Sequence, residues 1–480
     1  MLSDKSCIVI PALLLAIAAI APAQSLATLV NQPPHGAGLS FLLTDGTVLS
    51  QGTNYHDWYK LTPDVFGNYV NGTWTQVASL PAGYVPDAFS SAVLADGHVV
   101  IVGGEYNNGR FVLTNKGAIY DPTANTWTAL GHPAGWGYIG DSPSVVLPNG
   151  GFLVGRKLDM RMAVLNPATL QWKEVGSAGK SDFNAEEGWT LLPDGTVLTA
   201  DVSNAPNSER YTLSTGTWAS EGSTIVDLHS PSTSGPINYP GGTYYPPGEI
   251  GPAILRPDGT VFATGAANSG SAHTAVYHPG ATSSDPGTWT VGPDFPNDAA
   301  GDSSAALLTN GHVLVLGNSG KLYEFDGTNL TTEMRPASAF YLMVLPTGQV
   351  ILTGGRIQVY NSTGTYSPAW APAITSHPAT VVRGSTYQIS GTQFNGLSQA
   401  AAVGDEFQTA TNYPLVRLTN GATGHVFYAR THGHSTMGVA TGGAIVSTRF
   451  DVPATMETGA SSLEVVANGI PSQAVNVTVN

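Results

Sequence analysis

The stretch "NAEEGWTLLPDGTVL", residues 184–198, decides the fold because its second half is repeated along the chain. Asp194 and Gly195 stand between two short apolar runs, which is a strong sequence signal for a β-hairpin. We expect a type I′ turn there, in which both central residues have positive φ. The hairpin occurs seven times, and the turn glycines, about 50 residues apart, are Gly46, Gly97, Gly150, Gly195, Gly259, Gly311 and Gly348.

A second signal follows each hairpin about 25 residues later, where an aromatic residue opens another strand. Each repeat therefore has four short strands, and seven such units packed face to face around an axis form a closed β-propeller. We expect the repeated aromatic residues to fill the space between blades, whereas Trp58, Trp136 and Trp189 fall in or beside connecting segments. The repeated positions are Trp74, Trp127, Trp172, Trp218 and Trp289, with Leu330 and Tyr366 in the last two repeats.

The first 23 residues have the pattern of a secretory signal peptide, with an apolar run and a small-residue cleavage site near Ala23. We therefore expect a secreted protein, periplasmic or extracellular, without a membrane span in the mature chain. The single cysteine, Cys7, lies in the segment to be removed, so the mature chain should contain no disulfide and no thiolate metal site. The formal net charge of −15 argues against nucleic acid as a partner.

Two domains are expected after the signal peptide. Residues 28–372 carry the repeats of a seven-bladed Kelch-like β-propeller, and residues 373–480 read as short alternating strands of an immunoglobulin-like β-sandwich. The fold class is therefore all-β. A long Pro-, Gly- and Tyr-rich insertion at residues 227–251 separates the fourth and fifth repeats, and long insertions on rigid scaffolds are often functional.

Five repeats place a carboxylate eight or nine residues before the hairpin turn, at the expected mouth of the central channel. Converging carboxylates repel one another by about 4 kcal/mol per pair at 4 Å and an effective dielectric near 20. Hydrogen bonds from backbone amides, a bound cation such as calcium, or raised pKa values with shared protons would each offset this repulsion. If a cation is bound, Asp141, Glu186 and Asp302 are its expected ligands. The five residues are Asp87, Asp141, Glu186, Glu249 and Asp302.

Other polar motifs indicate a functional site less clearly. His432 and His434 in "THGHS" have metal-like spacing, but a third ligand is not apparent in the sequence, and we expect a solvated loop. Residues 54–60 and 155–162 are expected to be exposed blade loops that are able to contact a ligand. The sequence contains no nucleophile elbow, phosphate loop or zinc-protease motif.

With these motifs the chain resembles the galactose oxidase and glyoxal oxidase family, whose members join seven Kelch-like blades to a C-terminal sandwich. The most similar stretches are "SSAVLADGHVVIVGG" from Ser90 and "LEVVANGIPSQAVNVTV" from Leu463. The family oxidises alcohols or aldehydes with a copper ion and a tyrosine radical cross-linked to a cysteine. The positions matching its copper-radical residues are here Ala88, Ser338, Ala339 and Asn412, and the mature chain has no cysteine. The resemblance thus implies the scaffold without that redox centre, and copper is not expected.

In that family the sandwich sends a hairpin up the propeller channel. If this holds here, "GDEFQTATNYPLVR", residues 404–417, would carry Asn412 toward the acidic ring, with Arg417 as a counter-charge. These two residues complete the expected ligand-binding set.

Three functions follow from the sequence. The first is a secreted, non-redox propeller that binds a glycan, a small ligand or a protein at its loop face. The second is a carbohydrate-active enzyme on the same scaffold, either a galactose-oxidase-like oxidase or a hydrolase or lyase that uses Glu186, Asp141 or Asp302. The third is a structural extracellular component that acts as a spacer.

Overall fold

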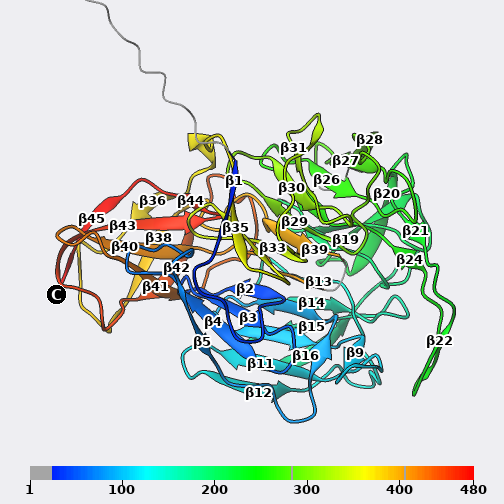
Figure 1. Ribbon diagram of the computed structural model, residues 1–480, viewed down its shortest axis with the longest axis horizontal. Coiled ribbons are helices and arrows are strands. Elements are labelled where there is room, and N and C mark those ends of the chain that lie inside the picture. Colours follow the sequence, from blue (N-terminus) through cyan, green and yellow to red (C-terminus); the bar gives the residue numbers. More distant parts are fainter. Residues whose placement is uncertain (1–23, 283–284, 405–406) are drawn as a thin grey trace, which may run out of the picture.

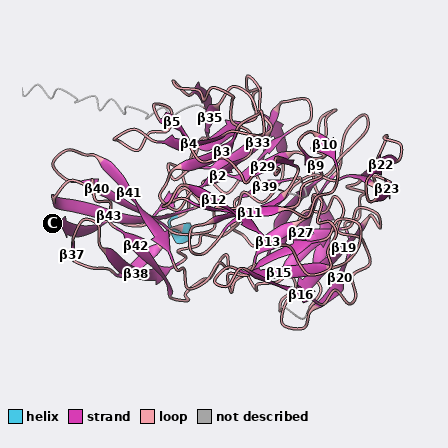
Figure 2. Cartoon of the chain, turned by 90° about the horizontal axis from the view of Figure 1, so that it is seen from below, coloured by secondary structure: helices cyan, strands magenta, loops and turns pink. Residues whose placement is uncertain are grey.

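The computed structural model describes residues 24–282, 285–404 and 407–480 (Figure 1). The expected signal peptide, residues 1–23, lies outside the described residues. The described chain is built of strands that pair antiparallel, except for one parallel pair in the C-terminal segment, and contains one turn of 3-10 helix, Pro368–Trp370 (Figure 2). The all-β prediction is therefore confirmed. Among the residues described, no helix has the length and apolar character needed to cross a bilayer.

Seven sheets of four or five strands follow one another along the chain, and we number them in that order. Sheet 1 contains β2 (Ser40–Leu42), β3 (Val48–Gln51), β4 (Trp58–Thr62) and β5 (Thr73–Gln76), and sheet 2 contains β7 (Ser90–Val93), β8 (Val99–Val102), β11 (Gly117–Asp121) and β12 (Thr126–Leu130). Sheet 3 contains β13 (Ser144–Val146), β14 (Phe152–Gly155), β15 (Met162–Asn166) and β16 (Gln171–Val175), and sheet 4 contains β17 (Thr190–Leu191), β18 (Val197–Ala200), β19 (Asn207–Thr212) and β20 (Thr217–Ser223).

The remaining three sheets have the same meander at their centre. Sheet 5 contains β25 (Ala253–Leu255), β26 (Val261–Thr264), β27 (Thr274–His278) and β28 (Thr288–Val291). Sheet 6 contains β29 (Ser304–Leu307), β30 (Val313–Leu316), β31 (Leu322–Phe325) and β32 (Leu330–Thr332), extended by β39 (Ala401–Val403). Sheet 7 contains β33 (Tyr341–Val344), β34 (Val350–Thr353) and β35 (Gln358–Asn361), and its fourth strand is β1 (Ser25–Thr28).

The first strands of these sheets lie beside one another at the centre of the array. Strand β2 contacts β33 and β7, β7 contacts β13, and β29 contacts β25 and β33. Buried apolar residues of sheets 3 and 4, among them Leu153 and Leu191, belong to one core cluster. The short runs of Val, Leu and Ile in these inner strands are almost fully buried because neighbouring sheets cover both of their faces.

The seven hairpin turns occur where the sequence predicts them, but their geometry is different. Gly195 has φ +82°, whereas the preceding Asp194 does not have a positive φ, so the turn is not type I′. Gly195 N donates to Leu192 O at 2.9 Å and Leu192 N to Thr196 O at 2.9 Å, which defines a three-residue loop with the glycine in the left-handed region. Asp194 Oδ1 accepts from Thr196 N at 3.0 Å, and this side-chain bond explains the Asp that precedes Gly.

The repeated tryptophans all lie in the fourth strand of their sheet, and Leu330 does so in β32. Trp127, Trp218 and Trp289 are buried, and Trp127 lies 4.8 Å, centroid to centroid, from Trp58 of the neighbouring sheet. Trp58 opens β4 directly beside the connecting segment, as expected, and it is fully buried because it packs between sheets 1 and 2.

Sheet 7 is completed by the beginning of the chain. Strand β1 pairs with β35 in antiparallel register, from Ser25 opposite Asn361 to Thr28 opposite Gln358. The assignment of Tyr366 to a fourth strand is therefore wrong, because that position of the sheet is taken by β1. Backbone hydrogen bonds thus join the segment that precedes the first repeat to the last repeat.

The C-terminal segment forms a separate nine-stranded sheet at one end of the molecule (Figures 1 and 2). Its core contains fully buried residues such as Val381, Val416 and Phe450. Its strands are β36 (Ala373–Ser376), β37 (Thr380–Val381), β38 (Thr386–Thr392), β40 (Leu415–Asn420), β41 (Val426–His432), β42 (Val446–Asp451), β43 (Gly459–Ala467), β44 (Ile470–Pro471) and β45 (Val475–Val479).

A segment between β38 and β40 leaves this sheet and enters the array of seven. Strand β39 pairs with β29, the first strand of sheet 6. Further along, Gln408 N donates to Ser91 Oγ of β7 at 3.1 Å, and Gln399 Oε1 accepts from Leu191 N of β17 at 2.7 Å. The segment thus contacts three inner strands, as the family resemblance implies.

The pairing of β1 gives a prediction for stability. A chain that begins at Leu29 lacks β1 and leaves the edge of β35 unpaired, so we expect its free energy of unfolding to fall by at least about 3 kcal/mol, relative to a chain that begins at Gln24. Urea denaturation of the two chains measures this difference. Equal free energies would show that the β1–β35 pairing does not hold the array together.

Candidate functional site

Four of the five predicted carboxylates come together at one end of the inner strands. Asp141, Glu186 and Asp302 precede β13, β17 and β29, and Asp87 belongs to β6 (Pro86–Asp87), just before β7. Asp302 interacts electrostatically with Glu186 and Asp87. The fifth, Glu249 in β24 (Gly248–Glu249), lines an adjoining cavity together with Asp302. The convergence predicted from the register of the hairpins is therefore observed.

A buried lysine supplies the positive charge of this central cluster. Lys157 Nζ lies 2.5 Å from both Asp141 Oδ2 and Glu186 Oε1, and 3.9 Å from Glu105 Oε1. The lysine side chain is fully buried. The Lys157 ammonium thus lies between Asp141 and Glu186, two of the residues that would bind a cation such as calcium if one is present, and that alternative stays a prediction.

Lys157 reaches the cluster because its loop turns inward. Its backbone N donates to Ile139 O at 3.0 Å, and Arg156 N donates to Arg161 O at 2.9 Å, which closes the loop between β14 and β15. The prediction that residues 155–162 form an exposed loop is therefore wrong for Lys157. In the other loop, residues 54–60, Tyr55 lines the central cavity as expected of a loop that contacts a ligand.

The insertion between sheets 4 and 5 also contributes to the cluster. It contains a hairpin of β22 (Ile237–Tyr239) and β23 (Gly242–Tyr244). Tyr244 OH donates to Glu186 Oε1 at 2.5 Å, and Lys157 Nζ lies 5.1 Å from the centroid of the Tyr244 ring. The insertion therefore closes one side of the lysine–carboxylate group.

Burial and like charges change the protonation of the carboxyls that Lys157 does not bridge. Burial, with the nearby Asp141, raises the pKa of Glu105 to about 8. Burial, with the nearby Glu186, raises the pKa of Asp302 to about 7. Burial also raises the pKa of Asp87, which receives a hydrogen bond from Tyr55. Protonated and ionised carboxyl groups therefore coexist in one cluster near neutral pH.

The backbone is strained where the cluster meets the central cavity. Glu186, Asp302 and Ala88 have φ values of 61°, 49° and 49°, in the left-handed region that residues other than glycine seldom adopt. Such a conformation costs about 1–2 kcal/mol per residue. Strain of this kind concentrates at binding and catalytic sites, where packing holds the side chain in one direction.

A central cavity of about 440 Å³ opens beside the cluster. Asp87, Glu105 and Asp302 line it together with Tyr55, Tyr106, Tyr341 and Phe340. Tyr106 stands directly opposite Asp87 in the pairing of β9 (Tyr106–Asn107) with β6. A second cavity of about 600 Å³ shares Asp302 and Phe340 with the first and is lined further by Glu249 and Arg335. The two cavities form a polar surface with aromatic walls.

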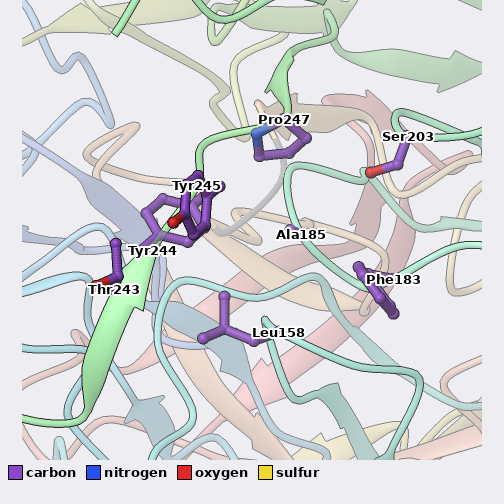
Figure 3. Close-up of a pocket in the computed structure, with 8 residues that line it drawn as sticks. All are labelled: Leu158, Phe183, Ala185, Ser203, Thr243, Tyr244, Tyr245 and Pro247. Carbon is purple, nitrogen blue, oxygen red and sulfur yellow. The ribbon is translucent and has the colours of Figure 1, made fainter. Parts of the chain in front are cut away.

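A smaller pocket of about 270 Å³ lies on the other side of Tyr244 (Figure 3). Its lining is mostly apolar and includes Leu158, Phe183 and Tyr245, of which Phe183 and Tyr245 are exposed. Tyr244 therefore separates an apolar pocket from the buried lysine–carboxylate group.

Asn412 and Arg417 do not reach the central cluster. Asn412 Nδ2 donates to Met437 O at 2.7 Å, and Arg417 binds Glu464 with Nε at 2.9 Å and Nη2 at 2.8 Å within the C-terminal sheet. The expectation for both is wrong because the entering segment turns earlier. Val403 and Phe407 line the central cavity, and Phe407 packs edge-on against Phe89 at 5.0 Å. Residues 405–406, within the stretch expected to enter the channel, lie outside the described residues.

The two histidines of the C-terminal sheet bind neighbouring side chains. His434 is buried, stacks on Tyr413, and its Nδ1 lies 2.9 Å from Thr448 Oγ1. Burial lowers the pKa of His434 to about 3. His432 Nε2 lies 3.1 Å from Asp451 Oδ1. The expectation of a solvated loop is therefore wrong for His434.

The donors of the central cavity do not fit a copper centre. Copper in proteins requires nitrogen or sulfur ligands, and among the described residues this cavity is lined by no histidine and no cysteine. The positions that match the family's copper-radical residues place Ala88 in the cavity wall and Ser338 and Ala339 in the wall of the adjoining one. The available donors are carboxyl and phenol oxygens.

Comparison with known proteins supports a Kelch-type scaffold. No family model matches the chain. A Kelch-like protein, terF, from Aspergillus terreus is 28% identical over 131 residues, which is 26% of this chain and 26% of that protein. The chain therefore matches about a quarter of the length of this curated relative.

Two solved structures are similar to this chain at low sequence identity. A fungal alcohol oxidase of the AA5 family, solved in complex with copper, is similar over 96% of this chain and all of that chain, with a TM-score of 0.54 and 12% identity. A streptogramin B lyase matches 71% of this chain and 97% of its own, with a TM-score of 0.46 and 13% identity. The chain is thus Kelch-like in part of its sequence and similar in fold to the galactose-oxidase-type AA5 oxidase.

Replacing Lys157 tests the balance of charge in the central cluster. Lys157→Met leaves Asp141 and Glu186 buried without their counter-charge, and breaking a buried ion pair in this way costs about 3–5 kcal/mol. We expect that loss in the free energy of unfolding at pH 7, with partial recovery at lower pH, where the carboxylates become protonated. The exposed Lys173→Met is the matched control. A Lys157→Met protein as stable as the control would contradict the assigned role.

The raised pKa of Glu105 predicts how stability depends on pH. Between the ordinary pKa of about 4.5 and the folded-state pKa of about 8, the folded chain retains a proton that the unfolded chain has released. This carboxyl therefore lowers the free energy of unfolding as pH rises through that window, by at most about 1.4 kcal/mol per pH unit. Glu105→Gln should reduce the slope between pH 5 and pH 8, measured by urea denaturation. Identical slopes in both proteins would contradict the shift.

Proposed function

We propose that this chain is a secreted, non-redox Kelch-like protein that binds a polyhydroxylated ligand, a glycan in the first instance, in its central cavity. In this proposal the seven sheets are the blades of a closed propeller over residues 28–372, and residues 373–480 form an immunoglobulin-like sandwich. The observation that carries the proposal is the lining of the 440 Å³ cavity, which combines three carboxyl side chains with five aromatic ones.

This lining suits the chemistry of a sugar. Carboxyl oxygens accept hydrogen bonds from neighbouring hydroxyls, and a protonated carboxyl also donates one. Aromatic faces such as those of Tyr106 and Tyr341 pack against the apolar C–H faces of a sugar ring. Because Lys157 offsets part of the negative charge and the pKa values of Glu105 and Asp302 are raised, a neutral ligand fits better than a polyanion. The adjoining 600 Å³ cavity offers room for further units of a chain.

Secretion is part of the same proposal. The described chain begins at Gln24 and β1 starts at Ser25, so cleavage near Ala23 would leave the strand that completes sheet 7 intact. Residues 24–480 contain no cysteine, which is compatible with an oxidising compartment.

A second candidate is an acid–base enzyme acting on a glycan, either a hydrolase or a lyase. It is favoured by the coexistence of protonated Glu105 and Asp302 with the Lys157-bridged Asp141 and Glu186. A carboxylic acid and a carboxylate near one substrate are the groups that such reactions use, and Asp141 and Glu186 lie in the cluster beside the cavity rather than in its lining. In this case the glycan bound in the central cavity would be a substrate that the protein cleaves.

Glycan-array screening of the purified mature chain, followed by calorimetry with the best ligand, tests the proposal. We expect Asp87→Asn and Tyr106→Ala to weaken binding at least about tenfold, because each removes a hydrogen bond or an aromatic contact in the cavity. Tyr245→Ala, in the separate apolar pocket, should bind like the unchanged chain.

The outcomes separate the two candidates. Release of shortened or unsaturated sugars, lost in Glu186→Gln but with binding retained, would favour the enzyme. A folded chain that binds no glycan, or a loss of binding in Tyr245→Ala alone, would overturn the proposed central site.

A further inference from the structure

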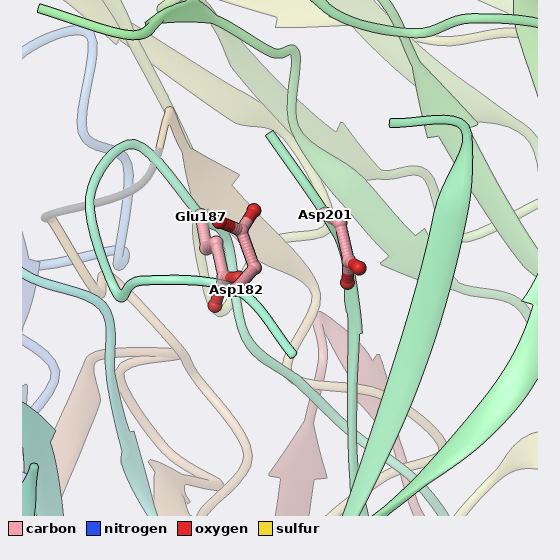
Figure 4. A group of neighbouring side chains, drawn as sticks. All are labelled: Asp182, Glu187 and Asp201. Carbon is pink, nitrogen blue, oxygen red and sulfur yellow. The ribbon is translucent and has the colours of Figure 1, made fainter. Parts of the chain in front are cut away.

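A second group of carboxylates lies in sheet 4, away from the two polar cavities. Asp182, Glu187 and Asp201 are neighbours (Figure 4), and each offers one carboxylate oxygen that lies within 4.8 Å of the other two. All three residues are buried. They come from two segments, the connection that leads into β17 and the turn that follows β18, so the group joins two loops of the same sheet.

The positive charge near this group is smaller than its negative charge. Lys180 Nζ donates to Glu187 Oε1 at 2.8 Å and to Glu209 Oε2 at 3.0 Å, and both the lysine and the two glutamates are almost fully buried. Four buried carboxyl groups thus share one ammonium group. Burying charge without compensation is costly, so this arrangement needs either protons or a further cation.

One oxygen of the group has no hydrogen-bond partner. Asp201 is only 2% exposed, and within the described chain its Oδ1 receives no hydrogen bond. Its other oxygen, Oδ2, accepts from Ser181 Oγ at 3.2 Å and Asn204 Nδ2 at 3.3 Å. Glu187 Oε2 receives only a long bond of 3.4 Å from Trp189 Nε1. Acceptor capacity therefore remains free in the interior of the group, which few buried polar groups show.

We propose that Asp182, Glu187 and Asp201 bind a calcium ion. Calcium takes six to eight oxygen ligands at about 2.3–2.6 Å in irregular geometry, so two of its ligands can lie about 5 Å apart, which matches the spacing of these oxygens. A doubly charged ion would leave the four carboxylates and Lys180 with a net charge of −1.

The surroundings allow the ion to enter. Asp182 accepts hydrogen bonds from Phe183 N at 2.7 Å and from Ser203 N at 2.8 Å. Phe183 and Ser203 both line the 270 Å³ pocket, so Asp182 is hydrogen-bonded to the backbone of two lining residues. In this proposal the ion and its water ligands would enter from that pocket.

The site would act on the central cavity through one loop. Glu187 belongs to the calcium group, whereas its neighbour Glu186 binds Lys157 and Tyr244 in the central cluster. An ion that ties Glu187 to Asp201 would therefore hold the loop that carries Glu186. The inference does not rest on the proposed glycan function, because none of its three ligands lines the two polar cavities.

Terbium luminescence tests the site, because Tb³⁺ replaces calcium at oxygen ligands and accepts energy from a nearby tryptophan. Trp189 is hydrogen-bonded to Glu187, and the Trp218 ring lies 4.6 Å from Lys180 Nζ. We expect tryptophan-sensitised Tb³⁺ emission from the full mature chain, displaced by added Ca²⁺. Asp201→Asn should weaken the apparent affinity at least about tenfold, whereas Asp302→Asn in the central cluster should leave it unchanged.

The midpoint of thermal unfolding, Tm, tests calcium binding on the unchanged chain, without the Asp201→Asn variant. We expect the Tm of the unchanged chain to rise with calcium concentration relative to the chelated protein, since a ligand that binds only the folded state stabilises it. The proposal would be overturned if no Tb³⁺ emission is seen and the Tm does not change with calcium concentration. Shared protons would then be what offsets the negative charge of the carboxylates. Emission lost in Asp302→Asn but kept in Asp201→Asn would overturn it as well, and would place the cation in the central cluster.

Discussion

The ammonium group of Lys157 between Asp141 and Glu186 is the constraint on which the centre of this molecule depends. The inner ends of the sheets converge, so carboxylates placed before their first strands come within a few ångströms of one another. Each unscreened pair at 4 Å costs about 4 kcal/mol at an effective dielectric near 20. The single positive charge of the lysine is shared by Asp141 and Glu186, and burial beside these charges raises the pKa values of Glu105 and Asp302, which favours their protonated forms.

The fold could be predicted from local patterns wherever a local cause determines it. The turn glycines all adopt positive φ, and the repeated tryptophans occupy the fourth strands, because turn chemistry and burial depend on residues close in sequence. The sequence does not reveal that β1 completes sheet 7, because that pairing joins positions more than 300 residues apart and β1 resembles any short strand. Tyr366 fits the spacing of the repeat but has no place in the sheet.

The candidate site also contains residues that local sequence patterns predict and residues that they do not. The carboxylates were predictable because their distance from the hairpin turn is constant, and that distance sets where each side chain enters the centre. Lys157, Glu105 and Tyr244 have no fixed place in the repeat, since each reaches the cluster through the path of a loop that tertiary contacts determine. Arg417 was predicted to reach the central cluster but does not. It has a suitable charge, but β40 turns it toward Glu464 in the C-terminal sheet.

The neighbouring residues Glu186 and Glu187 connect these observations. Each pairs with a different buried lysine, Glu186 with Lys157 and Glu187 with Lys180, so one short loop joins two charged groups on its opposite sides. The left-handed backbone at Glu186 turns the two side chains apart, and it persists because both are fixed by ion pairs. The cavity offers oxygen donors, whereas copper in proteins needs nitrogen or sulfur ligands. The sheets of this chain therefore determine where side chains meet, and the loops determine which side chains they are.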